Sequence, residues 1–309
     1  MTPLPVIAIV GATATGKSAL AVDSALWLVE RGQPAEIVNA DSMLVYRGMD
    51  IGTAKPTLAE RRGVAHHLID ILDVTQRASV AEFQGWARAA IADCRERGVV
   101  PIVVGGSALY VHAVLDRFEF PATDPAVRAG LEAELAALGC GALHARLAAL
   151  DPAAAAGIEQ GNGRRIVRAL EAIALTGSFR STLPAWEYAI DDVVQIGLAI
   201  DQAEMDARIA RRVRAMWDQG LVAEVEGLLA RGLRESVTAS RAIGYAQAIA
   251  HLDGFLTADE AQERIVVKTR QFARKQLSWW RRDDRIVWLD ALDSTPPTVL
   301  AAAGFPEPN

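Results

Sequence analysis

The chain has 309 residues, a formal net charge of −6, 51% apolar residues and 23% charged residues. This composition is typical of a soluble globular protein and excludes a long disordered polypeptide, and the length indicates one α/β core with an insertion or a second lobe. No apolar run approaches the roughly 20 residues of a membrane span and the N-terminus lacks a basic leader, so we expect a cytoplasmic protein with no membrane anchor. The only two cysteines, Cys94 and Cys140, match neither a disulfide framework nor a metal-ligand spacing, and we expect them in the core or at its boundary.

The first predicted strand, at 6–10, runs directly into a phosphate-binding motif. Gly11-Ala-Thr-Ala-Thr-Gly-Lys-Ser18 fits G-x-x-x-x-G-K-[ST], and an apolar helix pattern follows at 19–29. In such a P-loop the backbone amides and the helix N-terminus face an anion, Lys17 reaches the terminal phosphate and the Ser18 hydroxyl is placed for Mg²⁺. A chance match is disfavoured because both flanking elements are present. The motif predicts a diphosphate-bearing ligand, with Mg²⁺ as cofactor, bound by Gly11, Ala12, Thr13, Ala14, Thr15, Gly16, Lys17 and Ser18.

The second predicted strand, at 36–40, ends at the carboxylate of Asp41. Ligands of open α/β sheets gather at the carboxyl ends of the strands, so Asp41 is expected near the P-loop. It could accept a proton from a nucleophile, hold Mg²⁺ through water or cap the next turn, and the residue alone leaves these roles open.

The third and fourth predicted strands, at 67–71 and 101–104, flank a helix that begins with the capping box Ser79-x-x-Glu82. The fourth strand turns through Gly105-Gly106 into Ser107, which resembles a second anion cradle, although the glycines could simply permit close helix packing. A motor-type ATPase should have a Mg²⁺-binding Asp at the end of such a strand, and only Asp70 offers a loose substitute. This favours transfer to an acceptor over ATP hydrolysis.

From 124 to 176 the pattern changes to Ala- and Leu-rich helices without strands. We therefore predict an α/β fold in which a P-loop NTPase-like parallel sheet, flanked by helices, carries an inserted all-helical subdomain. The core comprises 1–118 and 192–292, and the helical insertion comprises 119–191. Strands at 195–200 and 285–289 and long helices at 204–230 and 258–282 complete the core, and we expect the tail at 293–309 to be poorly ordered.

The last of these helices concentrates positive charge. Between Arg264 and Arg285 there are eight basic residues against two acidic ones, a local net charge of +6. A helix would place Arg270, Arg274 and Arg281 near one face, while Phe272, Trp279 and Trp280 could pack elsewhere or present rings to bases. The segment is equally compatible with a solvated charged face over a Trp-anchored core.

Six strings, spread over nearly the whole chain, carry a resemblance to one known family. They are Gly11-Ala-Thr-Ala-Thr-Gly-Lys-Ser18, Asp41-Ser-Met-Leu-Val-Tyr46, the family-specific Met49-Asp-Ile-Gly-Thr-Ala-Lys-Pro56, Gly105-Gly-Ser-Ala-Leu-Tyr110, Arg241-Ala-Ile-Gly-Tyr245 and Thr269-Arg-Gln-Phe-Ala-Arg-Lys-Gln276. Together they resemble the bacterial tRNA dimethylallyltransferases, also called tRNA isopentenyltransferases. The resemblance implies transfer of a dimethylallyl group from dimethylallyl diphosphate to N6 of adenosine 37 in tRNAs that read codons starting with U, with the donor's diphosphate, not ATP, on the P-loop. It also implies that the helical insertion at 119–191 binds tRNA.

The same resemblance assigns roles to residues. Asp41 and Ser107 are the implied catalytic residues: Asp41 takes the proton of N6, and Ser107 contacts the tRNA at a position usually occupied by Thr. Arg164 and Ala246 depart from the family pattern, and each puts one tRNA contact in doubt. Arg208 and Arg212 could cap the diphosphate, although ordinary surface arginines are the default. The implied tRNA contacts are Asp41, Ser42, Met43, Leu44, Ser107, Arg128, Arg164, Arg165, Ile166, Val167, Arg168, Arg241, Ala242, Ile243, Gly244, Tyr245, Arg274, Lys275, Gln276, Leu277, Ser278, Trp279, Trp280 and Arg281.

Two alternatives stay open from the sequence. A prenyltransferase acting on free adenylate would need neither the helical insertion nor the basic helix, and a P-loop kinase or NTPase lacks its strand-end Asp. The expected partners are the anticodon stem-loop of tRNA and dimethylallyl diphosphate, and a monomer suffices to form the site. His66 and His67 are not expected to bind a metal, because adjacent strand residues point to opposite faces.

Overall fold

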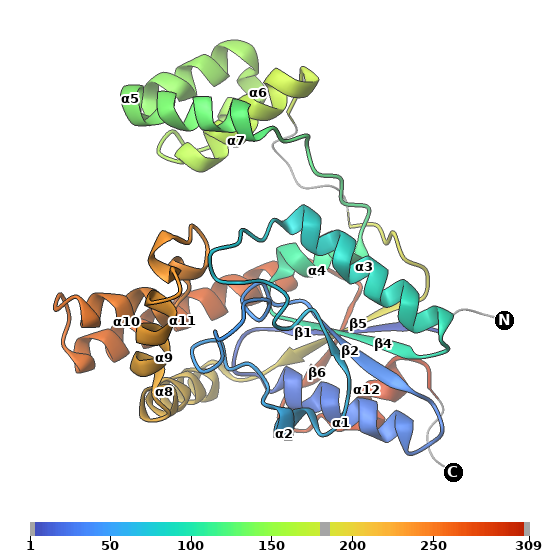
Figure 1. Ribbon diagram of the computed structural model, residues 1–309. Helices are drawn as coiled ribbons and strands as arrows, with labels where there is room; N and C mark the ends of the chain where they lie inside the picture. The colour runs from blue at the N-terminus through green and yellow to red at the C-terminus, as the bar shows by residue number, and fades with distance from the viewer. Residues whose placement is uncertain (1–3, 180–185, 306–309) are drawn as a thin grey trace. The chain divides into compact units, whose positions relative to one another are not determined.

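The structure is a computed structural model that describes residues 4–179 and 186–305 (Figure 1). Its six strands form one sheet in the order β3-β2-β4-β1-β5-β6, and every pairing between neighbouring strands is parallel. The predicted α/β fold with a parallel sheet is therefore confirmed. The strands are β1 (Val6–Gly11), β2 (Ala35–Asn39), β3 (His66–His67), β4 (Val100–Gly105), β5 (Val193–Ala199) and β6 (Ile286–Asp290).

The central strands are buried on both faces. Every residue of β1 and β4 is buried, as expected for the near-continuous apolar runs of a covered parallel sheet. Ile7 and Ile9 face a core shared with α1 (Lys17–Val29) and α12 (Pro296–Ala302), whereas Ala8 and Val10 face the opposite core. That second core is formed with α3 (Val80–Glu96), α4 (Ala108–Leu115) and α11 (Ala258–Trp280).

The third strand is shorter than predicted. It ends at His67, because Leu68 and Asp70 adopt the left-handed conformation with φ of 62° and 57°. The carbonyl of Leu68 accepts a hydrogen bond from the Asn39 side chain at 3.0 Å. A polar contact with the end of β2 thus replaces continued strand pairing.

The prediction of a poorly ordered tail is wrong for the described part of it. Residues 296–302 form α12, and Val299 and Leu300 are buried in the core that contains α1. Pro296 and Pro297 stand at the start of the helix, where proline is tolerated because its missing N–H has no intrahelical partner. Residues 306–309 lie outside the described part.

The other helices of the unit that contains the sheet are α2 (Leu58–Arg61), α8 (Gln202–Asp218), α9 (Leu221–Leu229) and α10 (Tyr245–Leu252), with 3₁₀ turns at η1 (Leu233–Glu235) and η2 (Ala239–Arg241). The sequence predicts one helix over 204–230, but the chain breaks at Gly220, whose φ of 99° starts α9 in a new direction. Helix α11 begins with a capping box between Thr257 and Glu260.

Residues 117–187 form a second compact unit, separate from the unit of residues 1–116 and 188–309. It contains α5 (Pro125–Leu150), α6 (Pro152–Ala156) and α7 (Gly163–Thr176). These helices have their own small core, which includes Leu143, Leu147, Ile166 and Leu170. Whereas the sequence analysis places the insertion at 119–191, the compact unit begins at Arg117 and ends at Glu187.

Helix α5 is long and apolar enough to cross a membrane by length and composition alone. Its backbone, however, is interrupted at Gly139, where φ is 79° and ψ is 168°. Each of the two helical segments is shorter than the roughly 20 residues that a span needs. The apolar side chains Leu131, Leu143 and Leu147 instead pack within the second unit.

Candidate active site

A cavity of about 1000 Å³ opens at the carboxyl ends of β1, β2 and β4. Its wall combines the P-loop, the segment that follows β2 and the glycine turn that follows β4. Side chains from α8 and α11 complete it. Three features that lie far apart in the sequence, at Lys17, Asp41 and Ser107, therefore line one cavity.

The P-loop has the backbone of an anion cradle. Gly11 and Gly16 have φ of 140° and 93°, and a Cβ on Gly11 would lie 2.9 Å from the Leu198 carbonyl oxygen. Gly16 precedes α1 without a side-chain cap, so the first amides of that helix remain open to a ligand. Thr15 closes the turn by donating its hydroxyl to the carbonyl of Ala12 at 3.0 Å.

Lys17 lies inside this cradle. Its ammonium donates to the carbonyl of Ala12 and lies 3.4 Å from the Thr15 hydroxyl. Burial lowers the pKa of Lys17 to about 7, the Asp41 carboxylate opposes the shift and the Arg212 guanidinium adds to it. An anionic ligand in the cavity would favour the charged form of Lys17.

Asp41 is held by its neighbours at the end of β2. The Asn39 side chain accepts from the backbone N–H of Asp41 at 2.8 Å and donates to its carbonyl at 3.0 Å. The Asp41 oxygen Oδ1 accepts from the backbone N–H of Met43 at 2.8 Å. Within the described residues, Oδ2 has no hydrogen-bond donor, so a half-buried carboxylate oxygen in the cavity wall can receive a proton.

Two arginines of α8 also face the P-loop, which corrects the default assignment of both as ordinary surface residues. Arg212 donates to the Thr13 hydroxyl at 3.3 Å and to the Thr53 carbonyl at 3.2 Å. Arg208 reaches the Ala14 carbonyl at 3.5 Å and is paired with Glu204 at 2.9 Å. Their spacing of four residues, which places both on one face of a helix, was the available sequence signal.

Gln276 connects two walls of the cavity. Its side chain accepts from the backbone N–H of Thr13 at 2.9 Å and donates to the carbonyl of Gly106 at 2.8 Å. A Cβ on Gly106 would lie 2.5 Å from the Gln276 amide nitrogen, so the glycine permits this contact. Ser107, half-buried in the cavity wall, precedes α4 and makes no side-chain capping bond.

Several residues predicted to contact tRNA are buried in this structure, and their contact with tRNA stays a prediction. Trp280 packs in the core with its ring centroid 5.7 Å from that of His112. Tyr245 donates its hydroxyl to Glu224 at 2.6 Å. The buried members are Ile166, Val167, Gly244, Tyr245, Gln276 and Trp280.

The other predicted tRNA contacts are accessible to different degrees. Those that are exposed are Arg164, Arg165, Arg241, Arg274, Lys275, Ser278 and Arg281. Those that are half-buried are Asp41, Ser42, Met43, Leu44, Ser107, Arg128, Arg168, Ala242, Ile243, Leu277 and Trp279. In the second unit, Arg128 and Arg168 both pair with the fully buried Glu171, at 2.6 and 2.9 Å, which gives these two arginines a structural role.

The basic residues between 264 and 285 likewise include some that pair with carboxylates and some that do not. Arg285 binds Asp116 and Asp283, each at 2.8 Å, and thus neutralises two buried carboxylates. Arg270 and Arg274 lie 3.7 and 3.5 Å from Asp206. Of the basic residues between 264 and 285, the exposed ones without an ion pair among the described residues include Lys275, Arg281 and Arg282.

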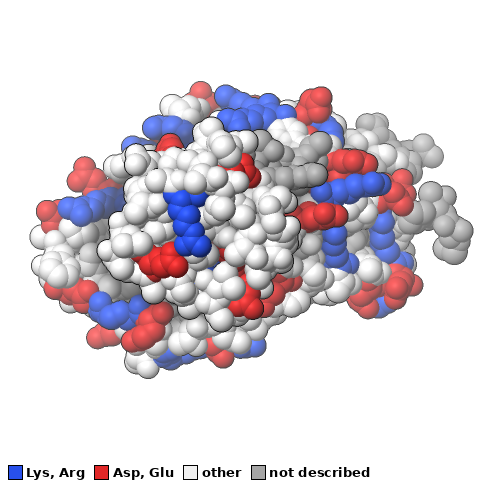
Figure 2. Space-filling view, turned by 90° about the horizontal axis from the view of Figure 1, so that it is seen from above, with Lys and Arg blue, Asp and Glu red and all other residues white. Residues whose placement is uncertain are grey.

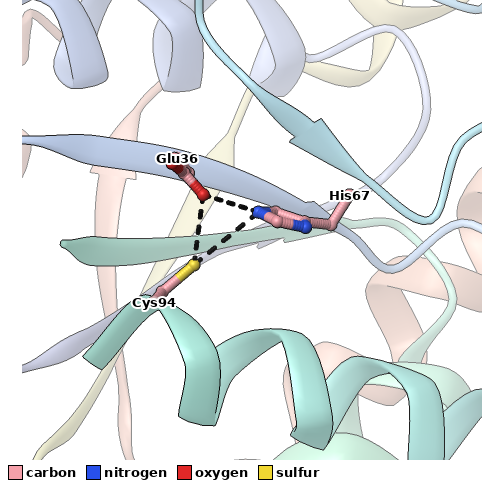
Figure 3. A group of neighbouring side chains, drawn as sticks. All are labelled: Glu36, His67 and Cys94. Atoms are coloured by element: carbon pink, nitrogen blue, oxygen red, sulfur yellow. Dashed lines mark hydrogen bonds and ion pairs between the residues drawn. The ribbon is translucent and has the colours of Figure 1, made fainter. Parts of the chain in front are cut away.

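A separate polar group joins β2, β3 and α3 (Figure 3). The Glu36 carboxylate lies 2.7 Å from His67 Nε2 and 3.5 Å from Cys94 Sγ. These three residue types can ligate a metal, but Arg97 already binds both oxygens of Glu36, at 2.8 and 2.7 Å. Burial and the neighbouring Glu36 raise the pKa of Cys94 to about 12, which favours the protonated thiol beside the ion pair of Glu36 and Arg97.

The chain is similar to proteins of one family. A family described as IPP transferase matches residues 44–283. A tRNA dimethylallyltransferase of Kineococcus radiotolerans is 58% identical over 96% of this chain and 94% of that protein, and one of a Nocardioides species is 58% identical over 92% and 91%. The crystal structure of a full-length tRNA isopentenylpyrophosphate transferase from Bacillus halodurans is 39% identical, with a TM-score of 0.69 over 97% of this chain and 94% of that chain.

Proposed function

Since the chain belongs to the IPP transferase family, we propose that it transfers a dimethylallyl group from dimethylallyl diphosphate to N6 of adenosine 37 in tRNAs that read codons starting with U. The observation that carries the proposal is the single cavity in which the P-loop, the Asp41 carboxylate and Arg212 meet. A diphosphate cradle and a proton acceptor in one cavity are what this transfer requires.

The donor's diphosphate binds on the P-loop. Departure of the diphosphate breaks an allylic C–O bond and leaves negative charge on oxygen. The loop amides, Lys17, Arg208 and Arg212 surround that place and stabilise the charge as it develops.

Mg²⁺ fits the oxygen atoms of this site. Ser18 is exposed at the start of α1, and its hydroxyl has no hydrogen-bond partner among residues 4–179 and 186–305. Together with diphosphate oxygens it would form an all-oxygen ligand set, which Mg²⁺ prefers. When bound, Mg²⁺ would neutralise part of the charge of the leaving diphosphate.

Asp41 acts on the acceptor. As the nitrogen of the adenine amino group bonds to the allylic carbon, the C–O electron pair leaves with the diphosphate and one N6 proton passes to the carboxylate. The unbonded Oδ2 of Asp41 is the oxygen that receives this proton. Ser107, in the wall beside it, contacts the nucleotide.

The acceptor base must leave its stack to enter the cavity. Extrusion is least costly for an unpaired base, and the anticodon loop supplies one. Exposed basic residues near the C-terminal end of α11 would bind the tRNA backbone. We propose that the enzyme works as a monomer in the cytoplasm.

An acceptor competition tests this function against its alternatives. The purified protein is incubated with Mg²⁺, labelled dimethylallyl diphosphate and either a tRNA with adenosines at 36 and 37 or free AMP, while ATP hydrolysis is followed in parallel. We expect label on adenosine 37 alone. Label on AMP would identify an adenylate prenyltransferase, and ATP hydrolysis without label transfer would identify a P-loop NTPase.

A further inference from the structure

The loop after β2 is anchored by a carboxylate that does not line the cavity. Glu224, on α9, accepts three hydrogen bonds from consecutive backbone amides, those of Asp50, Ile51 and Gly52, at 3.0, 2.7 and 3.2 Å. The hydroxyl of Tyr245 donates to the same carboxylate at 2.6 Å. Three successive N–H groups that converge on one anion leave the loop little freedom to shift.

Close packing reinforces this anchor. Tyr245 is fully buried, and a Cβ on Gly52 would lie 2.5 Å from its ring carbon Cε2. Only glycine therefore lets the loop approach the tyrosine closely enough for the amides to reach Glu224. The hydroxyl of Thr53 tightens the turn by donating to the carbonyl of Met49 at 2.6 Å.

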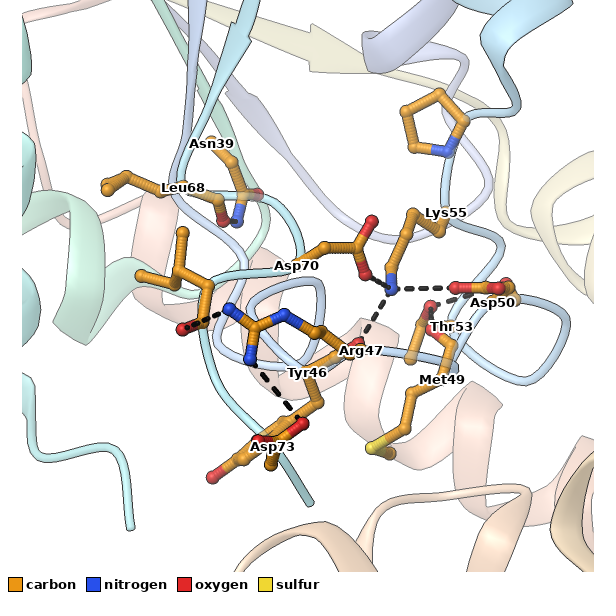
Figure 4. A network of polar contacts seen from close by, with 12 residues as sticks. Asn39, Tyr46, Arg47, Met49, Asp50, Thr53, Lys55, Leu68, Asp70 and Asp73 are labelled. Carbon is orange, nitrogen blue, oxygen red and sulfur yellow. Dashed lines mark hydrogen bonds and ion pairs between the residues drawn. The ribbon is translucent and has the colours of Figure 1, made fainter. Parts of the chain in front are cut away.

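A second anchor holds the other end of the loop (Figure 4). The ammonium of Lys55 lies 2.7 Å from Asp50 and 2.5 Å from Asp70, and it donates to the carbonyl of Tyr46 at 2.7 Å. Its side chain is only 3% exposed, so these contacts replace its hydration. The backbone of residues 50–55 is therefore fixed on both sides.

Between the two anchors, the loop contacts an arginine of the phosphate site. The carbonyl of Thr53 accepts from Arg212 at 3.2 Å, and the other guanidinium nitrogen of Arg212 reaches the Thr13 hydroxyl at 3.3 Å. The guanidinium of Arg212 has a fixed planar geometry. The position of the Thr53 oxygen therefore fixes the direction of the remaining N–H groups of Arg212.

We propose that Glu224 is a positioning residue: by holding the amides of residues 50–52, it places the Thr53 carbonyl so that Arg212 faces the diphosphate bound on the P-loop. This inference rests on the proposed function, because it assumes that the cavity binds a diphosphate. Glu224 acts entirely through the loop backbone and through Arg212.

The test measures binding of inorganic diphosphate, with Mg²⁺, by titration calorimetry. Glu224→Gln keeps the shape of the side chain but removes its charge and one acceptor oxygen, and we expect about 5- to 20-fold weaker binding. Glu226→Gln, an exposed position on the same helix, is the matched control and should bind as the wild type does. Tyr245→Phe, which removes only the hydroxyl that donates to Glu224, should weaken binding in the same direction by less.

A double-mutant cycle separates positioning from general destabilisation. In an Arg212→Ala background, Glu224→Gln should cause no further loss, because the residue that it positions is gone. Losses that add fully, or wild-type affinity in Glu224→Gln, would overturn the inference even if tRNA prenylation proceeds. A wild-type chain that binds no diphosphate would overturn the proposed function, and with it this inference.

Discussion

Lys17 is a cavity residue whose pKa the fold lowers into the neutral range. Removing its ammonium from water makes the neutral form accessible near pH 7, while its contacts with the Ala12 carbonyl and the Thr15 hydroxyl keep it in the cradle. A diphosphate bound on the P-loop would place negative charge beside this ammonium. Donor binding is therefore coupled to the ionisation of one lysine.

This coupling predicts how donor affinity depends on pH. Lys17 is charged below about pH 7 in the free protein, and the bound anionic diphosphate raises that pKa, so binding takes up a proton above pH 7. Calorimetry with dimethylallyl diphosphate should show affinity that is nearly constant just below pH 7 and falls by up to about tenfold per pH unit above it. It should level off above the pKa of the complex.

Lys17→Arg is the control for this prediction, because an arginine stays charged over the whole range. Its donor affinity should vary little between pH 7 and 9. An equal decline in both proteins would assign the pH dependence to a group other than Lys17. Lys17→Ala should weaken donor binding at every pH below 7.

Helix α11 organises the cavity through Gln276, a residue that the family resemblance predicts to contact tRNA. The helix contacts two strand-end loops through this one side chain, whose amide accepts from a backbone N–H of the first loop and donates to a carbonyl of the second. Because Gln276 is buried, it orders the P-loop before any ligand arrives.

Gln276→Leu should therefore impair donor binding more than tRNA binding. The substitution leaves the amide of Thr13 without its partner, a loss of about 1–3 kcal/mol when the group is buried. We expect the KM for the donor to rise roughly tenfold and the melting temperature to fall by a few degrees, measured by steady-state kinetics and thermal unfolding. Gln271→Leu, exposed on the same helix, should change neither. An unchanged donor KM in Gln276→Leu would contradict this account of the helix.

Short sequence patterns predicted the helices, the strands and the motifs. Contacts between residues far apart in the sequence determine how the side chains of the site are arranged. The P-loop, the Asp41 turn and the family strings were readable because each is a short contiguous segment, and the family resemblance is confirmed by the relatives. Glu224 carries no such signal, because its backbone partners lie 172 to 174 residues away. Arg212 was noted as a possible diphosphate cap and Gln276 within a family string, but their contacts with Thr13 span 199 and 263 residues and could not be predicted from local patterns. Trp280 was ambiguous for the same reason, since only tertiary packing decides between core and surface.

The distribution of charge over the molecule bears on how an acidic protein binds an RNA. In the face drawn in Figure 2, acidic and basic side chains are interspersed, in keeping with the net charge of −6. Buried carboxylates neutralise several of the arginines, including Arg128, Arg168 and Arg285. Binding of tRNA should therefore depend on a few exposed cations and not on the total charge.

Replacement of Arg281 or Arg282 by alanine tests this expectation. Each variant should weaken tRNA binding and reduce the slope of log K against log salt by about one for every lost phosphate contact. Donor affinity should stay unchanged, because neither residue lines the cavity. Filter binding between about 50 and 200 mM salt measures the slope, and a wild-type slope in both variants would exclude these cations from the RNA interface.

The central claim is that the cavity joins a diphosphate cradle to a proton acceptor, and Asp41→Ala tests it most directly. Single-turnover transfer of labelled dimethylallyl groups to tRNA is measured together with the affinities for tRNA and donor. We predict that transfer is abolished, by a factor of about 10² or more, while tRNA affinity is largely retained. Full transfer activity in Asp41→Ala would contradict the account, because the cavity would then need a different base.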